Sequence, residues 1–184
     1  MRNRSLGWVF VAATVAVLFG SSTPAFAQEK GKVGLTIGFP SSVGVIFHVT
    51  DKIAIRPEFD FEFGSTEIDS PGIDSSQDSS VFGTGISALF YVRKWDDLHL
   101  YVSPRWDYSH GSASTEVTET TANGWGLTGS MGAQYALGKR FAVFGEVGVG
   151  YRHSSTKGPA IIEAELKSDS VGLRSGVGVV VYFK

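Results

Sequence analysis

Alternation of apolar with small or polar residues dominates the end of the sequence and predicts a β-strand there. In the last fifteen residues, Ser170–Lys184, apolar side chains recur at almost every second position from Val171 to Phe183. The positions between them include three glycines, Gly172, Gly176 and Gly178, together with Arg174 and Tyr182. A period of two is typical of a strand whose two faces meet different surroundings. One face of this segment therefore suits hydrocarbon, and the other suits a crowded polar interior.

The same alternation recurs through the rest of the chain and predicts eight strands in all. Their approximate bounds are Lys32–Phe39, Val43–Val49, Ile53–Phe63, Ser80–Val92, Leu98–Ser109, Gly124–Leu137, Phe141–His153 and Asp169–Phe183.

The connections between these segments alternate between short and long. Three of them are turns of a few residues, whereas the connections at 64–79, 110–123 and 154–168 are long, polar and rich in Ser, Thr, Asp and Glu. This asymmetry is typical of up-and-down outer-membrane barrels, which have short periplasmic turns and longer external loops. The connection at 40–42 is short although it belongs to the external end, and the first two segments are short for a membrane crossing.

The two faces of the segments differ consistently. One face is apolar, with aromatic residues near both ends of the segments, as expected where a barrel crosses the two membrane interfaces. The other face combines many glycines with charged residues, which fits the narrow interior of an eight-stranded barrel. We expect the charged residues of the third and fifth segments to pack over glycines of the seventh and eighth. The predicted interior charge network is Arg56, Glu58, Asp60, Glu62, Arg105, Asp107, Glu146, Arg152 and Arg174.

The sequence therefore predicts an all-β fold, an eight-stranded antiparallel up-and-down transmembrane β-barrel that is monomeric. A soluble barrel of lipocalin type is the alternative, but its outer face should be rich in Lys and Glu. Opposite charges inside the barrel should pair, because an unpaired buried charge is costly.

The N-terminus predicts export from the cytoplasm. Arg2 and Arg4 precede an apolar run, and Ala25-Phe26-Ala27 forms a small-residue cleavage site. Residues 1–27 are thus predicted to be a signal peptide, and residues 28–184 to be one barrel domain. Cleavage would remove two of the sixteen basic residues and none of the eighteen acidic ones, leaving a net charge of −4. This charge disfavours nucleic acid as a partner, and the absence of cysteine excludes disulfides and thiolate chemistry.

Two stretches carry a family resemblance. The segment Val43–Phe63 (VGVIFHVTDKIAIRPEFDFEF) reads as strand, tight turn and strand, and the chain ends in GLRSGVGVVVYF. In these stretches the chain resembles the small eight-stranded outer-membrane barrels of the OmpA transmembrane-domain and OmpX type. The resemblance implies a polar interior network rather than an open, porin-like pore. It also implies outer-membrane lipid and the outer-membrane assembly machinery as partners, in a Gram-negative-type bacterium.

Candidate chemistry is sparse. The stacked carboxylates Glu58, Asp60 and Glu62 could perform acid–base work or hold a cation, but pairing with interior arginines is the preferred interpretation. No cofactor or metal motif is present in the sequence. We therefore expect no enzymatic activity, and a structural or surface-contact role through the long external loops, with a small gated pore as one alternative.

A second alternative is an enzyme. His153-Ser154-Ser155 resembles the His-x-Ser arrangement of outer-membrane lipid A deacylases, which are also eight-stranded barrels. In that hypothesis His153 would act as the base for Ser155, with Glu163 or Glu165 orienting the imidazole ring.

Overall fold

The structure is a computed structural model that describes residues 30–39, 42–70, 73–115, 119–158 and 165–183. The predicted signal peptide, residues 1–27, lies outside the described residues. Within the described ranges the chain forms eight strands and no helix long and apolar enough to cross a membrane. The strands are β1 (Val33–Phe39), β2 (Ser42–Thr50), β3 (Ile53–Ser70), β4 (Ile73–Trp95), β5 (Leu98–Thr115), β6 (Glu119–Ala136), β7 (Phe141–Lys157) and β8 (Glu165–Tyr182).

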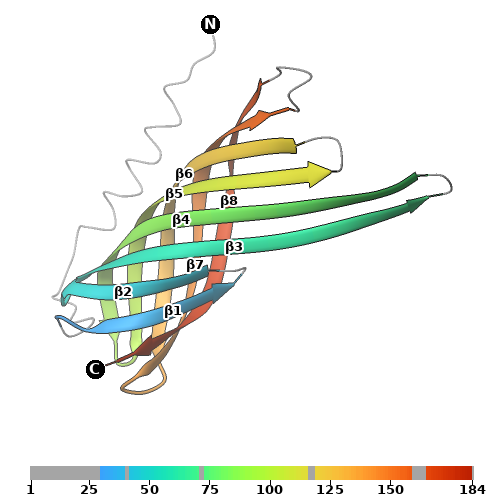
Figure 1. Ribbon diagram of the computed structural model, residues 1–184. Helices are drawn as coiled ribbons and strands as arrows, with labels where there is room; N and C mark the ends of the chain where they lie inside the picture. Colours follow the sequence, from blue (N-terminus) through green and yellow to red (C-terminus); the bar gives the residue numbers. More distant parts are fainter. Residues whose placement is uncertain (1–29, 40–41, 71–72, 116–118, 159–164, 184) are drawn as a thin grey trace, which may run out of the picture.

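Each strand pairs antiparallel with the next, and β8 pairs with β1, so the sheet closes into a barrel. The predicted fold class is therefore confirmed. The turns β2–β3, β4–β5 and β6–β7 lie at one end, together with the C-terminus, and we call this the short-turn end (Figure 1). The opposite end, where β3 and β4 reach furthest from the barrel, is the long-hairpin end (Figure 1).

The polar stretches predicted to be long loops are mostly strand instead. The β3–β4 ladder continues from the barrel as far as the pair Ser70↔Ile73, and β5–β6 continues to the pair Ser114↔Glu119. In β7–β8 the last pair is Lys157↔Glu165. The loop prediction was wrong because a hairpin that projects into water has two solvated faces. Such a hairpin needs no apolar alternation to keep its backbone hydrogen bonds.

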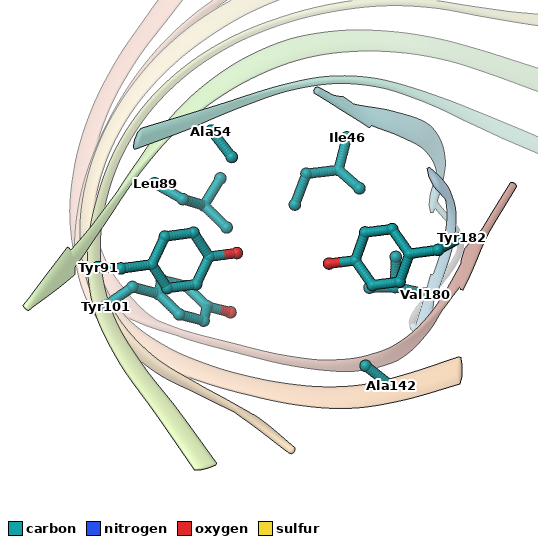
Figure 2. Close-up of a cluster of buried hydrophobic side chains, with 8 residues drawn as sticks. All are labelled: Ile46, Ala54, Leu89, Tyr91, Tyr101, Ala142, Val180 and Tyr182. Atoms are coloured by element: carbon teal, nitrogen blue, oxygen red, sulfur yellow. The ribbon is translucent and has the colours of Figure 1, made fainter. Parts of the chain in front are cut away.

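The faces of the strands follow the predicted parity. Apolar residues on the outer face are exposed, among them Phe61, Ile86, Trp106 and Val147. The inward side chains at the short-turn end form a buried cluster in the middle of the ring (Figure 2). Tyr91 and Tyr101 approach from one side of the lumen and Tyr182 from the other (Figure 2). The interior is thus filled with side chains, as expected for eight strands.

Candidate functional site

The short-turn end of the lumen is closed by hydrogen-bonded aromatic and amide side chains. The Tyr91 hydroxyl donates to Gln134 Oε1 at 3.0 Å, and Gln134 Nε2 donates to the Tyr182 hydroxyl at 2.8 Å. His48 Nε2 lies 3.1 Å from the same hydroxyl and its ring stacks on that of Tyr91. All four side chains are buried. The hydrogen bonds join Tyr91, Gln134, Tyr182 and His48 into one buried layer across the lumen.

A charged layer follows further along the lumen. Arg56 lies between two carboxylates, with Nε 3.3 Å from Glu58 and Nη2 2.7 Å from Glu146. Arg105 bonds to the other oxygen of Glu58, and the Tyr101 hydroxyl donates to Glu146 at 2.8 Å. The side chains of Arg56 and Glu58 are only 2% and 4% exposed. Such deeply buried charges are tolerated only when each has its partner.

Asp107 organises the third layer, towards the long-hairpin end. Its carboxylate lies 2.8 Å from Arg152, 3.1 Å from Arg174 and 3.9 Å from Arg105. Asp107 is buried, whereas the side chains of Arg152 and Arg174 are each 42% exposed. The carboxylate of this layer is therefore buried inside the barrel, whereas its arginines Arg152 and Arg174 reach solvent.

The structure brings eight of the nine predicted interior charges into one connected network. Asp60 joins it through Arg105, at 3.6 Å. The ninth residue, Glu62, is exposed and takes part in none of the ion pairs found among the described residues. Tyr91, which the predicted network lacked, is a central member of the first layer. The sequence could have identified Tyr91 as an inward residue, because it alternates with the outward residues Phe90 and Val92 of β4.

The predicted packing of charges over glycines of the seventh and eighth strands is wrong. Bulky inward side chains lie instead over the glycine directly opposite on the neighbouring strand. A Cβ on Gly132 would stand 2.4 Å from the Tyr101 ring, and one on Gly126 would stand 2.9 Å from Asp107. The same holds for Asp60 over Gly83 and Phe144 over Gly178. Strands in a barrel are tilted, so an inward side chain leans across its cross-strand neighbour.

The alternative catalytic residues lie on the outer face of β7 and β8, near the long-hairpin end, and the structure separates them into two pairs. His153 Nδ1 lies 2.8 Å from Asp169, which also accepts a hydrogen bond from Tyr151 at 2.6 Å. The Ser155 hydroxyl donates to Glu165 at 2.8 Å. That hydrogen bond holds the pKa of the exposed Glu165 carboxyl below its ordinary value. Glu163 lies outside the described residues.

This geometry differs from the predicted one. The acid on His153 is an aspartate, and the serine hydroxyl is directed to a carboxylate rather than to the imidazole. A nucleophilic serine needs hydrogen-bond contact with its base, which a bond to Glu165 does not provide. Among the described residues, no group of three His, Asp or Glu side chains is arranged to hold a metal ion.

An antiparallel up-and-down barrel with an apolar exterior and a filled, polar interior is the architecture of outer-membrane β-barrels. A family model for the outer membrane protein beta-barrel domain matches residues 13–183. The chain therefore belongs to that family.

Several solved structures resemble this chain at low sequence identity. A major outer membrane protein from Thermus thermophilus is 12% identical with a TM-score of 0.51, over 83% of this chain and 98% of that chain. Ail, the attachment invasion locus protein of Yersinia pestis, is 12% identical with a TM-score of 0.49, over 84% and 99%. The N-terminal β-barrel domain of Pseudomonas aeruginosa OprF is 14% identical with a TM-score of 0.42, over 85% and 100%. No curated protein sequence matches the chain.

Proposed function

We propose that this protein is a non-enzymatic component of the outer membrane that contacts extracellular proteins through its β3–β4 hairpin. In this proposal the signal peptide is cleaved after Ala27 and residues 28–184 are inserted into the outer membrane of a Gram-negative-type bacterium. The assembly machinery of that membrane inserts the chain as a monomer. The observation that carries the proposal is the projection of β3 and β4 beyond the other strands (Figure 1).

The projecting hairpin offers an unpaired strand edge. β2 pairs with β3 only as far as Phe59, whereas the β3–β4 ladder continues to Ser70. Among the described residues, β3 from Asp60 to Ser70 therefore has β4 as its only neighbour. An exposed strand edge can accept an extended peptide as an additional strand.

The charge of the hairpin supports a basic partner. The sequence from Gly64 to Ser79 contains four acidic residues and no basic one. An extended segment with alternating lysines would place its charges beside this acidic hairpin while its backbone bonds to β3. Binding that depends on such charge attraction should weaken as salt is added.

A hairpin deletion tests the proposal. The protein is reconstituted in phosphatidylcholine nanodiscs and titrated with an extended lysine–valine repeat peptide. A variant in which a two-residue Asn-Gly turn replaces residues 66–77 should lose binding, whereas the same replacement of residues 112–121, at the β5–β6 tip, should retain it. Equal binding by both variants would contradict the proposal, and a gel shift on heating would confirm that both are folded.

We also expect no lipid hydrolysis. The Ser155 hydroxyl is bonded to Glu165, and Asp169 is the partner of His153, so the base and the nucleophile are not aligned with each other. Purified barrel incubated with lipid A in detergent should release no acyl chains. Release that disappears in both Ser155→Ala and His153→Asn would instead establish the esterase.

The lumen should likewise conduct no steady ion current, because the layer of Tyr91, Gln134 and Tyr182 fills its short-turn end. Planar-bilayer recording of the purified monomer measures this directly. A large, steady conductance would favour the pore alternative.

A further inference from the structure

Among the residues that the structure describes, the wall of the barrel is incomplete beside the β1–β2 hairpin. β8 pairs with β1 only from Val177 to Tyr182, and β3 pairs with β2 only up to Phe59. Beyond these residues the described parts of β8 and β3 each keep one neighbour, β7 and β4. We call the region between β3 and β8 beyond the tip of β1 the notch. β8 is open there, because a Cβ on Gly172 would meet nothing within 4 Å and one on Gly176 only the Phe39 carbonyl at 3.6 Å.

The notch lies at membrane depth. β1 has seven residues, fewer than the roughly 9–11 that a strand needs to cross a bilayer. Beside the notch, β8 continues its apolar outer face with Val171, 72% exposed, and Leu173, 85% exposed. An unpaired strand edge is not tolerated against hydrocarbon unless it lines a water-filled cavity or contacts another molecule. The notch must therefore be wet or occupied.

A polar cavity of about 160 Å³ lies on the inner side of the notch. Three arginines and three carboxylates line it, so its formal charges balance: Arg56, Arg105, Arg174, Glu58, Asp60 and Glu146. Arg105 Nε and Nη2 are buried in this wall and donate no hydrogen bond. Their nearest carboxylate oxygens are those of Asp60, 3.6 Å from Nη2, and Asp107, 3.9 Å from Nε, which is too far for a normal hydrogen bond. Buried donors held this far from an acceptor are costly, and a carboxylate oxygen in the cavity would satisfy them.

An apolar groove of about 700 Å³ lies on the outer side. It follows one row of cross-strand partners, from Leu100 through Ala133, Gly145 and Val177 to Phe39. Ala133 and Gly145 are small, so the row is depressed beside the larger Met131 and Val147 of the next row. A depression of this size and composition on a membrane-facing surface fits a hydrocarbon chain.

The cavity and the groove meet at the notch. Both are lined by Phe39, Ser175, Gly176 and Val177, and also by Glu146. The same residues thus border a polar chamber inside the barrel and an apolar groove outside it. We propose that the notch binds a single-chain carboxylate amphiphile, with the carboxylate inside near Arg105 and the chain in the outer groove. The notch would then be a lateral route between the lumen and the membrane.

Dodecanoate is a suitable probe, with the protein in phosphatidylcholine nanodiscs. Binding should saturate and should shift the amide NMR signals of Arg105 inside and Gly145 outside. Dodecyltrimethylammonium has the same chain but a cationic head, and it should not shift the Arg105 signal. Signal changes on the outer face alone, or equal effects of the two amphiphiles, would overturn the proposal.

Groove-filling variants supply the matched comparison. Gly145→Leu should weaken dodecanoate binding about tenfold, the effect of overfilling a packed site. Gly129→Leu changes another outward glycine, which does not line the groove and where an added Cβ would meet nothing within 4 Å. This variant should bind dodecanoate as the unaltered protein does. If Gly145→Leu does not fold, Ser175→Leu serves as the second groove-filling variant, because Ser175 is exposed on β8 and lines the same groove. Unchanged binding in the folded groove variants, or equal loss with Gly129→Leu, would exclude the groove as the chain site.

Discussion

The two ends of this barrel are built differently although the same strands form both. At the short-turn end all eight strands are paired on both sides, and buried Tyr, Gln and His side chains close the lumen. Towards the long-hairpin end β1 and β2 stop, β3 and β8 lose one neighbour each, and the interior arginines Arg152 and Arg174 become half-exposed. Closure and burial therefore belong to one half of the molecule, and the surface contact and lateral access that we propose belong to the other.

The difference shows how one short hairpin alters a closed sheet. A barrel removes the problem of strand edges only where its ring is complete. Shortening β1 and β2 restores two edges, one beside the membrane and one continuing into the β3–β4 projection. Two roles are therefore proposed for the open half and none for the closed half.

The largest difference in stability is expected between a buried carboxylate of the closed half and an exposed carboxylate of the open half. Glu58→Gln removes a carboxylate that pairs with both Arg56 and Arg105, and it should lower the free energy of unfolding by about 3–5 kcal/mol. Glu62→Gln changes the same residue type on the same strand face, where it is exposed, and should change that energy by less than about 0.5 kcal/mol. Urea unfolding in lipid vesicles measures both, and equal losses would show that the two halves are alike.

A charge on the outer face tests depth in the membrane. Val147→Arg places a cation near the middle of the apolar belt and should cost about 2–4 kcal/mol. Leu173→Arg lies beside the notch, where water can reach the guanidinium, and should cost about 0–1 kcal/mol. The same vesicle unfolding experiment distinguishes them. A larger cost at Leu173 would contradict a hydrated notch.

Glycine substitutions test the cross-strand packing of the closed half. Gly132→Ala forces a methyl group against the Tyr101 ring and should destabilise the barrel by about 1–3 kcal/mol. Gly129→Ala, three residues away on the outer face, meets nothing and should change stability by less than about 0.5 kcal/mol. The temperature at which the folded gel band disappears reports both. Similar values would remove the packing explanation for these glycines.

The smallest effect is expected at the solvated end of the open half. Ser155→Ala removes the hydroxyl that donates to Glu165, so the carboxyl pKa should rise towards its ordinary value of 4.5. The pKa of the Glu165 carboxyl is lowered in the folded protein, so its hydrogen bond to Ser155 stabilises the fold above pH 4.5. That stabilisation is lost as the pH falls through the folded pKa. NMR titration of the Glu165 carboxyl measures the shift. An unchanged pKa would show that the hydroxyl contributes nothing.

The strands that face lipid could be predicted from sequence, because a membrane imposes strict alternation on them. β8 and β3 within the barrel followed that rule, whereas their projecting ends did not and were mistaken for loops. In water both faces of a hairpin are solvated, so the pattern that identifies a strand is absent.

The interior was predictable in membership but not in pairing. Parity alone places Arg56 and Glu58 inside. Which carboxylate meets which arginine, and which glycine lies under Tyr101, depends on the register of neighbouring strands. A single sequence does not contain that register, so the glycine partners were assigned to the wrong strands. The short connection at 40–42 was the visible sign of the notch.

Amide hydrogen exchange along β8, in nanodiscs, tests the difference between the two halves most directly. From Val177 to Tyr182 both edges of β8 are paired, so every amide in that stretch should be protected. From Ser168 to Gly176 only the β7 side is paired, so alternate amides should exchange rapidly with the water of the notch. Uniform protection along the whole of β8 would show that the wall is sealed and would contradict the account.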